Sequence, residues 1–91
     1  MRPIESHVLL AVIEHDRDFL MRLHDAGVVP KDEQELSPDH VEVARVAYTL
    51  VHDLEVNWAG VEVILHMRSE LSATRRQVAE LVRRLRQAQR G

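Results

Sequence analysis

The sequence predicts an all-α protein with a compact helical head and a long C-terminal coiled-coil helix. Residues suited to cap helices occur at Asp16, Ser37 and Asn57, each ahead of apolar residues at helical spacing. From Ile64 onward the apolar residues instead follow a seven-residue repeat. No strand-length run of alternating polar and apolar residues occurs. These observations together predict four or five helices.

The first helical segment extends over Val8–Leu23, where apolar residues recur three and four positions apart. Asp16 lies inside this segment and is suited to cap a new helix at Arg17, because its carboxylate accepts from the free amides of a first turn. That predicts two helices joined near residues 14–16, while the lack of a glycine there leaves one continuous helix as the alternative. Gly27 is expected to end the segment.

A polar connection is expected from Val28 to Leu36, and short extended pieces at most at residues 2–6 and 30–36. The next helix begins at Ser37-Pro38-Asp39, where serine caps, proline fits the first helical position and the acid meets the positive end of the helix dipole. We expect it to run to Leu54. Its expected apolar face consists of Val41, Ala44, Ala47, Tyr48, Val51 and Leu54, with Val43 and Leu50 at the edge.

The last helical region is expected to start at the Asn57 cap, and its first inward-facing residues are Trp58, Val61, Ile64 and Leu65. Beyond it, the a and d positions of a coiled coil are apolar for three to four heptads, apart from Thr74, with Ser69 and Ser72 as candidate break points. The predicted dimerisation residues are Ile64, Met67, Leu71, Val78, Leu81 and Leu85. The alternative is a helix that folds back on its own head. Residues 1–66 would form the head and residues 67–91 the dimerisation helix of one structural domain.

Charge divides the chain in the same way. Residues 1–66 hold thirteen acidic and five basic residues, a net charge of −8, whereas residues 67–91 hold seven arginines and two acids, a net charge of +5. Cysteine is absent, which excludes disulfides and thiolate metal sites. With neither an apolar run that could span a bilayer nor a signal peptide, a cytoplasmic location and no membrane partner are expected.

Catalytic and cofactor motifs are not found in the sequence. The six histidines lack metal-ligand spacing, the serines lie where caps and turns favour them, and three glycines form no phosphate-binding loop. We therefore expect a binding protein with no cofactor and no metal, and not an enzyme.

The most specific stretch is Asp53-Leu-Glu-Val-Asn-Trp-Ala-Gly-Val-Glu-Val-Ile-Leu65. It resembles a turn of MerR-like helix-turn-helix proteins and, with Gly27-Val28-Val29, is most similar to the CbpM-type chaperone-modulator family. That resemblance implies an inhibitor that binds the basic helix of the J-domain of a CbpA- or DnaJ-like co-chaperone. It also implies an antiparallel homodimer. The alternatives are a MerR-like transcriptional regulator of heat-shock type and an assembly factor that bridges chaperone subunits.

DNA-binding relatives carry a basic wing after the second helix, whereas this chain reads Lys-Asp-Glu-Gln-Glu-Leu at residues 31–36. Because phosphate contacts dominate DNA affinity, an acidic wing disfavours nucleic-acid binding, and we expect no nucleic-acid partner. The expected partner-binding residues are Asp18, Asp25, Asp32, Glu33 and Glu35, with Val28 and Val29 as the apolar centre. Asp32, Glu33 and Glu35 are the stronger candidates because no capping role is evident for them.

Overall fold

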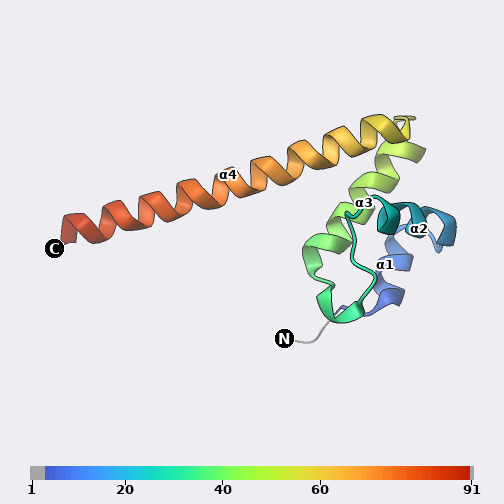
Figure 1. Ribbon diagram of the computed structural model, residues 1–91, viewed down its shortest axis with the longest axis horizontal. Helices are drawn as coiled ribbons and strands as arrows, with labels where there is room; N and C mark the ends of the chain where they lie inside the picture. The colour runs from blue at the N-terminus through green and yellow to red at the C-terminus, as the bar shows by residue number, and fades with distance from the viewer. Residues whose placement is uncertain (1–3, 91) are drawn as a thin grey trace.

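The computed structural model describes residues 4–90, which form four α-helices and one short 3₁₀ turn. In chain order these are α1 (Ser6–Val12), α2 (Arg17–Asp25), η1 (Glu33–Glu35), α3 (Pro38–His52) and α4 (Trp58–Arg90). Residues 4–90 contain no strand, so the all-α prediction is confirmed. Figure 1 shows α1, α2 and α3 gathered at one end, while most of α4 projects away from them as a single rod.

The first segment is two helices, and the alternative of one continuous helix is wrong. Glu14 and His15 both adopt left-handed backbone conformations, with φ of 54° and 60°. Such a conformation costs a non-glycine residue about 1–2 kcal/mol. The Asp16 carboxylate then accepts from the Phe19 amide at 3.0 Å, which confirms the predicted cap of α2. The turn therefore needs no glycine, because the cap and the packing of both helices offset its strain.

Gly27 ends α2 as expected, through a left-handed residue just past the helix end. Its φ is 74°, and its amide donates to the His24 carbonyl at 3.0 Å. The Val28 amide donates back to the Leu23 carbonyl at 3.2 Å, which completes a Schellman motif.

The expected extended piece at residues 30–36 is instead a connection that contains η1. The Asp32 carboxylate accepts from the Gln34 amide at 2.9 Å and so starts this turn. Of the other expected extended piece, residues 2–6, residues 2 and 3 lie outside the described residues and Ser6 already begins α1. Pro38 is the first residue of α3, and the Ser37 amide donates to Nδ1 of His40 at 3.0 Å, so a histidine completes this cap.

The turn from α3 to α4 differs from expectation at Leu54. The helix α3 ends at His52, and Leu54 lies beyond it with 63% of its surface exposed, so its assignment to the apolar face is wrong. The Asn57 side chain accepts from the Gly60 amide at 2.8 Å, which confirms the Asn57 cap. From Trp58 onward α4 continues for 33 residues, so the break expected at Ser69 and Ser72 does not occur.

The core lies where all four helices and the connection meet. Ala44 and Ala47 are fully buried on α3, and their small side chains let the other helices approach. Only the first turns of α4 enter the core, through Val61 and Leu65, whereas Ile64 is partly exposed rather than inward-facing. The buried residues are Leu9, Ile13, Phe19, Leu23, Val29, Leu36, Ala44, Ala47, Val61 and Leu65.

Gly60 serves the turn rather than the approach of another helix. A Cβ atom at this position would lie 2.8 Å from Cγ1 of Val56, closer than real Cβ contacts allow. The missing side chain therefore lets residues 53–57 fold against the start of α4.

Candidate functional site

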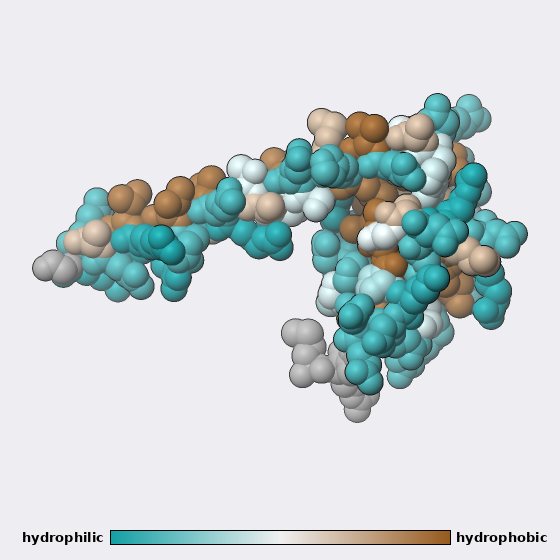
Figure 2. Space-filling view, in the orientation of Figure 1, coloured by the Kyte–Doolittle hydropathy of each residue, from teal (hydrophilic) through white to brown (hydrophobic). Residues whose placement is uncertain are grey.

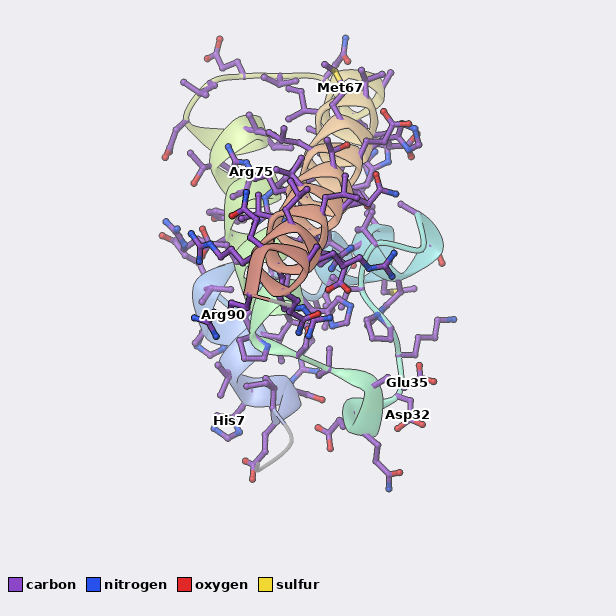
Figure 3. The ribbon with its side chains drawn as sticks, turned by 90° about the vertical axis from the view of Figure 1, so that its left-hand side faces the viewer. His7, Asp32, Glu35, Met67, Arg75 and Arg90 are labelled. Carbon is purple, nitrogen blue, oxygen red and sulfur yellow. The ribbon has the colours of Figure 1, made fainter. Side chains whose placement is uncertain are left out.

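The acids of the connection form the first candidate surface. Asp32 and Glu35 are exposed and lie near each other at the lower end of the head, with their carboxylates directed to solvent (Figure 3). Together with His24, Lys31 and His40 they line one shallow depression. Neither carboxylate forms an ion pair among the described residues, so both are available to a basic partner.

Glu33 has a structural role that its place in the sequence did not reveal. Its carboxylate accepts from the backbone amide of Ser6 at 2.9 Å and from the Ser6 hydroxyl, and Ser6 is the first residue of α1. Glu33 therefore caps α1 from a position 27 residues away. Asp32 similarly caps η1, so the expectation that these acids have no capping role is wrong for both.

The contact with Ser6 predicts how Glu33 affects stability at low pH. The hydrogen bond from the Ser6 side chain, followed by that from the Ser6 backbone, lowers the pKa of Glu33 below its ordinary value. A carboxyl group with a depressed pKa in the folded state stabilises it above the unfolded pKa, and this contribution is lost as pH falls through the folded value. We expect Glu33→Gln to reduce stability at neutral pH, and the difference from the wild type to shrink as pH falls below the ordinary pKa of a glutamate and through the lowered pKa of Glu33. Urea unfolding across a pH series measures this, and a constant difference would contradict it.

Asp18 and Asp25 do not join the acids of the connection. Both are exposed, at the first turn and the last residue of α2, about 10 Å apart along the helix axis. Asp25 instead lines a cleft of about 680 Å³ between the head and α4, together with Asp39 and Val28. In this cleft Asp39 pairs with Arg68 of α4 at 3.4 Å, which links the two parts. The predicted acidic surface is thus divided: Asp25 lies in this cleft, Asp18 lies at the first turn of α2, and the other acids lie on the connection.

The predicted apolar centre of the partner surface is also corrected. Val29 is only 2% exposed and belongs to the core, so it cannot contact a partner. Its carbonyl accepts from Nδ1 of His24 at 3.1 Å, which fixes the start of the connection. Val28 is half-buried and leaves only part of its side chain accessible.

The second candidate surface is an apolar stripe along α4. All six predicted dimerisation residues are exposed, from 37% for Ile64 to 63% for Leu85. Figure 2 shows apolar side chains along the upper edge of α4, out to its C-terminal end. Because α4 points away from the head, the fold-back alternative is wrong (Figure 1). The stripe comprises Ile64, Met67, Leu71, Val78, Leu81 and Leu85, extended by Val63 and Val82.

An aromatic cluster joins α2, α3 and α4 and was not expected from the sequence. Phe19 makes edge contacts with Tyr48 and Trp58, at centroid distances of 5.5 and 5.8 Å. The Arg22 guanidinium lies 5.2 Å from the Trp58 ring centroid, and the Tyr48 hydroxyl donates to Glu14 at 3.2 Å. Partial burial and then the Glu14 carboxylate raise the pKa of Tyr48. All three aromatic residues of the chain thus fix the position of α4 on the head.

The histidines form no metal site in the part of the chain that the structure describes. No group of three histidines or carboxylates among residues 4–90 could hold a metal ion. Two histidines instead form hydrogen bonds to the backbone. Nδ1 of His24 donates to the Val29 carbonyl, and Nδ1 of His40 accepts from the Ser37 amide. No helix within residues 4–90 has the length and apolar character needed to cross a bilayer.

Comparison with known proteins agrees with this arrangement of two short helices, a connection, the helix α3 and a long last helix. The family model described as MerR HTH family regulatory protein matches residues 4–86. No curated protein and no solved structure matches the chain. The family match covers the head and nearly all of α4, and the chain therefore belongs to the MerR helix-turn-helix family of regulatory proteins.

Proposed function

We propose that this chain is a chaperone modulator that binds the J-domain of a CbpA- or DnaJ-like co-chaperone and inhibits it. The observation that carries the proposal is the exposed, unpaired carboxylate pair of Asp32 and Glu35, at the position where DNA-binding relatives carry a basic wing. The resemblance of residues 53–65 to the CbpM-type family supplies the partner. A J-domain presents a basic helix to Hsp70, so a protein that covers this helix blocks stimulation of Hsp70.

The charges of the head favour a basic protein over DNA. On α2, Arg22 is engaged with Trp58, which leaves Arg17 as the remaining basic side chain besides His24. In the connection, Lys31 is outnumbered by Asp32, Glu33 and Glu35. Since DNA affinity depends on cations that neutralise phosphates, this surface repels a duplex and attracts a basic helix.

The proposed active form is a homodimer through the apolar stripe of α4. Contiguous exposed apolar surface of this extent is uncommon on a monomer and typical of an interface. The stripe is about 31 Å long from Ile64 to Leu85, and it lies on a face of α4 that the head leaves free. A symmetric pair of α4 helices buries both stripes at once.

The acidic connection predicts the kinetics of partner binding. Replacing Asp32 with asparagine and Glu35 with glutamine removes two charges, and we expect the rate of association with a J-domain to fall about 3- to 10-fold at low salt. The salt dependence of the association rate is expected to flatten, because long-range attraction between exposed charges is what salt screens. Stopped-flow or surface-based kinetics across a salt series measure both effects.

The matched control for this experiment is the pair Asp53→Asn and Glu55→Gln, which removes the same two charges near the far end of α3. Glu33 stays unchanged because it caps α1. If the control slows association as much as the test pair, the binding surface lies elsewhere on the head. If wild-type protein neither binds a J-domain nor reduces its stimulation of Hsp70, the proposed function is wrong.

A regulator that binds DNA is the second candidate, because the family description names regulatory proteins. The result that favours it is a footprint on the gene's own promoter at physiological salt. Loss of this footprint when Arg17 and Arg22 are replaced would identify α2 as the DNA-recognition helix.

A further inference from the structure

The face of α4 that points away from the apolar stripe carries a row of arginines. Arg76, Arg83 and Arg90 recur every seven residues, and Arg86 lies between the last two. With Arg75, which lies next to Arg76, all five fall within about 100° of one another around the helix axis. Figure 3 looks nearly along α4 and shows Arg75 and Arg90 on the same side of the rod. We call these five residues the arginine face.

The charge of the arginine face is largely uncompensated. Arg83 is held by Glu80, whereas the other four arginines are exposed and form no ion pair within residues 4–90. Arg76 also lines the cleft beside the head, where acids reduce its effective charge. Arg83 already lies about 27 Å beyond Leu65, the last core residue of α4. Since exposed charges more than about 10 Å apart are largely screened at 0.1 M salt, the acids of the head do not neutralise the C-terminal turns.

The side chains between the arginines favour a phosphate ligand over a protein. Ser72 and Ala79 lie on this face, both are exposed, and neither is large enough to form an apolar centre. Protein-binding surfaces have such a centre, with charges at the rim. Surfaces that bind nucleic acid are instead polar and strongly positive. Guanidinium groups also match phosphate oxygens with two parallel hydrogen bonds.

The straightness of α4 favours a single strand over a duplex. The helix is uninterrupted, and the arginine face extends about 22 Å along it from Arg75 to Arg90. A duplex presents each of its two backbones to a straight rod only once per turn of about 34 Å. A flexible single strand has a phosphate at every nucleotide and can follow the whole row. No aromatic residue follows Trp58, so α4 offers no base-stacking platform along this row and no basis for sequence preference.

We infer that the arginine face of α4 binds the phosphate backbone of single-stranded nucleic acid without sequence preference. The expectation of no nucleic-acid partner rests on the acidic connection, which belongs to the head, whereas this surface lies on the projecting part of α4. The arginine face points away from the stripe, so it stays accessible in the proposed dimer. The inference depends neither on that dimer nor on the J-domain.

Titration of a short, labelled oligouridylate with the full chain, followed by fluorescence anisotropy across a salt series, tests the contact. With three to four phosphates bound, the logarithm of the affinity is expected to fall with the logarithm of salt concentration at a slope of about −2 to −3. Arg86→Gln with Arg90→Gln should lower the affinity at least about tenfold at low salt and roughly halve this slope. Ala79→Glu, which places a carboxylate among the arginines, should act in the same direction.

The matched control is Arg17→Gln with Arg45→Gln, which removes the same charge from exposed positions on α2 and α3. We expect it to change the affinity less than about twofold, because neither side chain lies near the row. Equal losses in the control and in the tail pair place the contact on the head and overturn the inference. Failure of the wild type to bind the oligouridylate at low salt overturns it as well.

Three further probes test the assignment of the ligand. Single-stranded DNA of the same length is expected to bind equally, because only the phosphates are contacted, and a duplex of that length more weakly. Equal or tighter binding of the duplex, or of an oligoglutamate peptide of the same charge, overturns the assignment to a single strand. The tail pair should still bind a J-domain at the wild-type rate. A failure of this inference therefore leaves the proposed function standing, and the reverse is also true.

Discussion

Replacing Leu23 with alanine is expected to lower the free energy of unfolding by about 2–5 kcal/mol. Leu23 is 0% exposed and lies in the core cluster with Phe19 of α2 and Val29 of the connection. Truncation of this side chain leaves a cavity in the core between α2 and the connection. A domain of this size has a total stability of about 5–13 kcal/mol, so this one substitution removes a large part of it.

The matched control is Met21→Ala, two residues away on the same helix. Met21 is 61% exposed, so its truncation is expected to change the free energy of unfolding by no more than about 0.5 kcal/mol. Urea unfolding followed by the fluorescence of Trp58, the only tryptophan, reports on the head and not on the free part of α4. Similar losses in the two variants would contradict the burial of this face of α2.

Helix starts were predictable because each is a local event. The caps at Asp16 and Asn57 depend on a side chain that reaches an amide three residues later, and both were found as expected. The ends were less predictable where tertiary packing decides them. Glu14 and His15 adopt strained, left-handed backbone conformations. The helix α3 ends at His52, two residues before the end predicted at Leu54, and the chain then turns toward Asn57.

The candidate site was predictable only in part, because its geometry depends on contacts between distant residues. The exposed charges of Asp32 and Glu35 follow from composition, but the cap that Glu33 provides for Ser6 joins residues 27 positions apart. The burial of Val29 could not be predicted for a similar reason. Val29 lies in a polar connection, where no regular spacing of apolar residues indicates which side chain faces the core. The stripe of α4, by contrast, follows a seven-residue repeat and was exposed at every predicted position.

Replacing Leu81 with glutamate is expected to abolish the proposed dimer. Leu81 lies in the exposed stripe of α4, and a symmetric pair buries it twice. Burial of a leucine side chain contributes about 1.5–3 kcal/mol, so the loss of two is worth at least about 3 kcal/mol. That corresponds to a dissociation constant raised at least about 100-fold, before the cost of placing a carboxylate in the seam is added.

The control is Ala79→Glu, which adds the same charge at an exposed position two residues earlier on another face of α4. We expect this variant to sediment like the wild type at micromolar concentration, whereas Leu81→Glu sediments as a monomer. Circular dichroism should show a folded head in both, because no residue of α4 beyond Leu65 belongs to the core. If the wild type is itself a monomer, or if both glutamates act alike, the stripe is not a self-association surface. Its apolar side chains would then have to be covered by a different protein, since a seam of this length left in water favours nonspecific association.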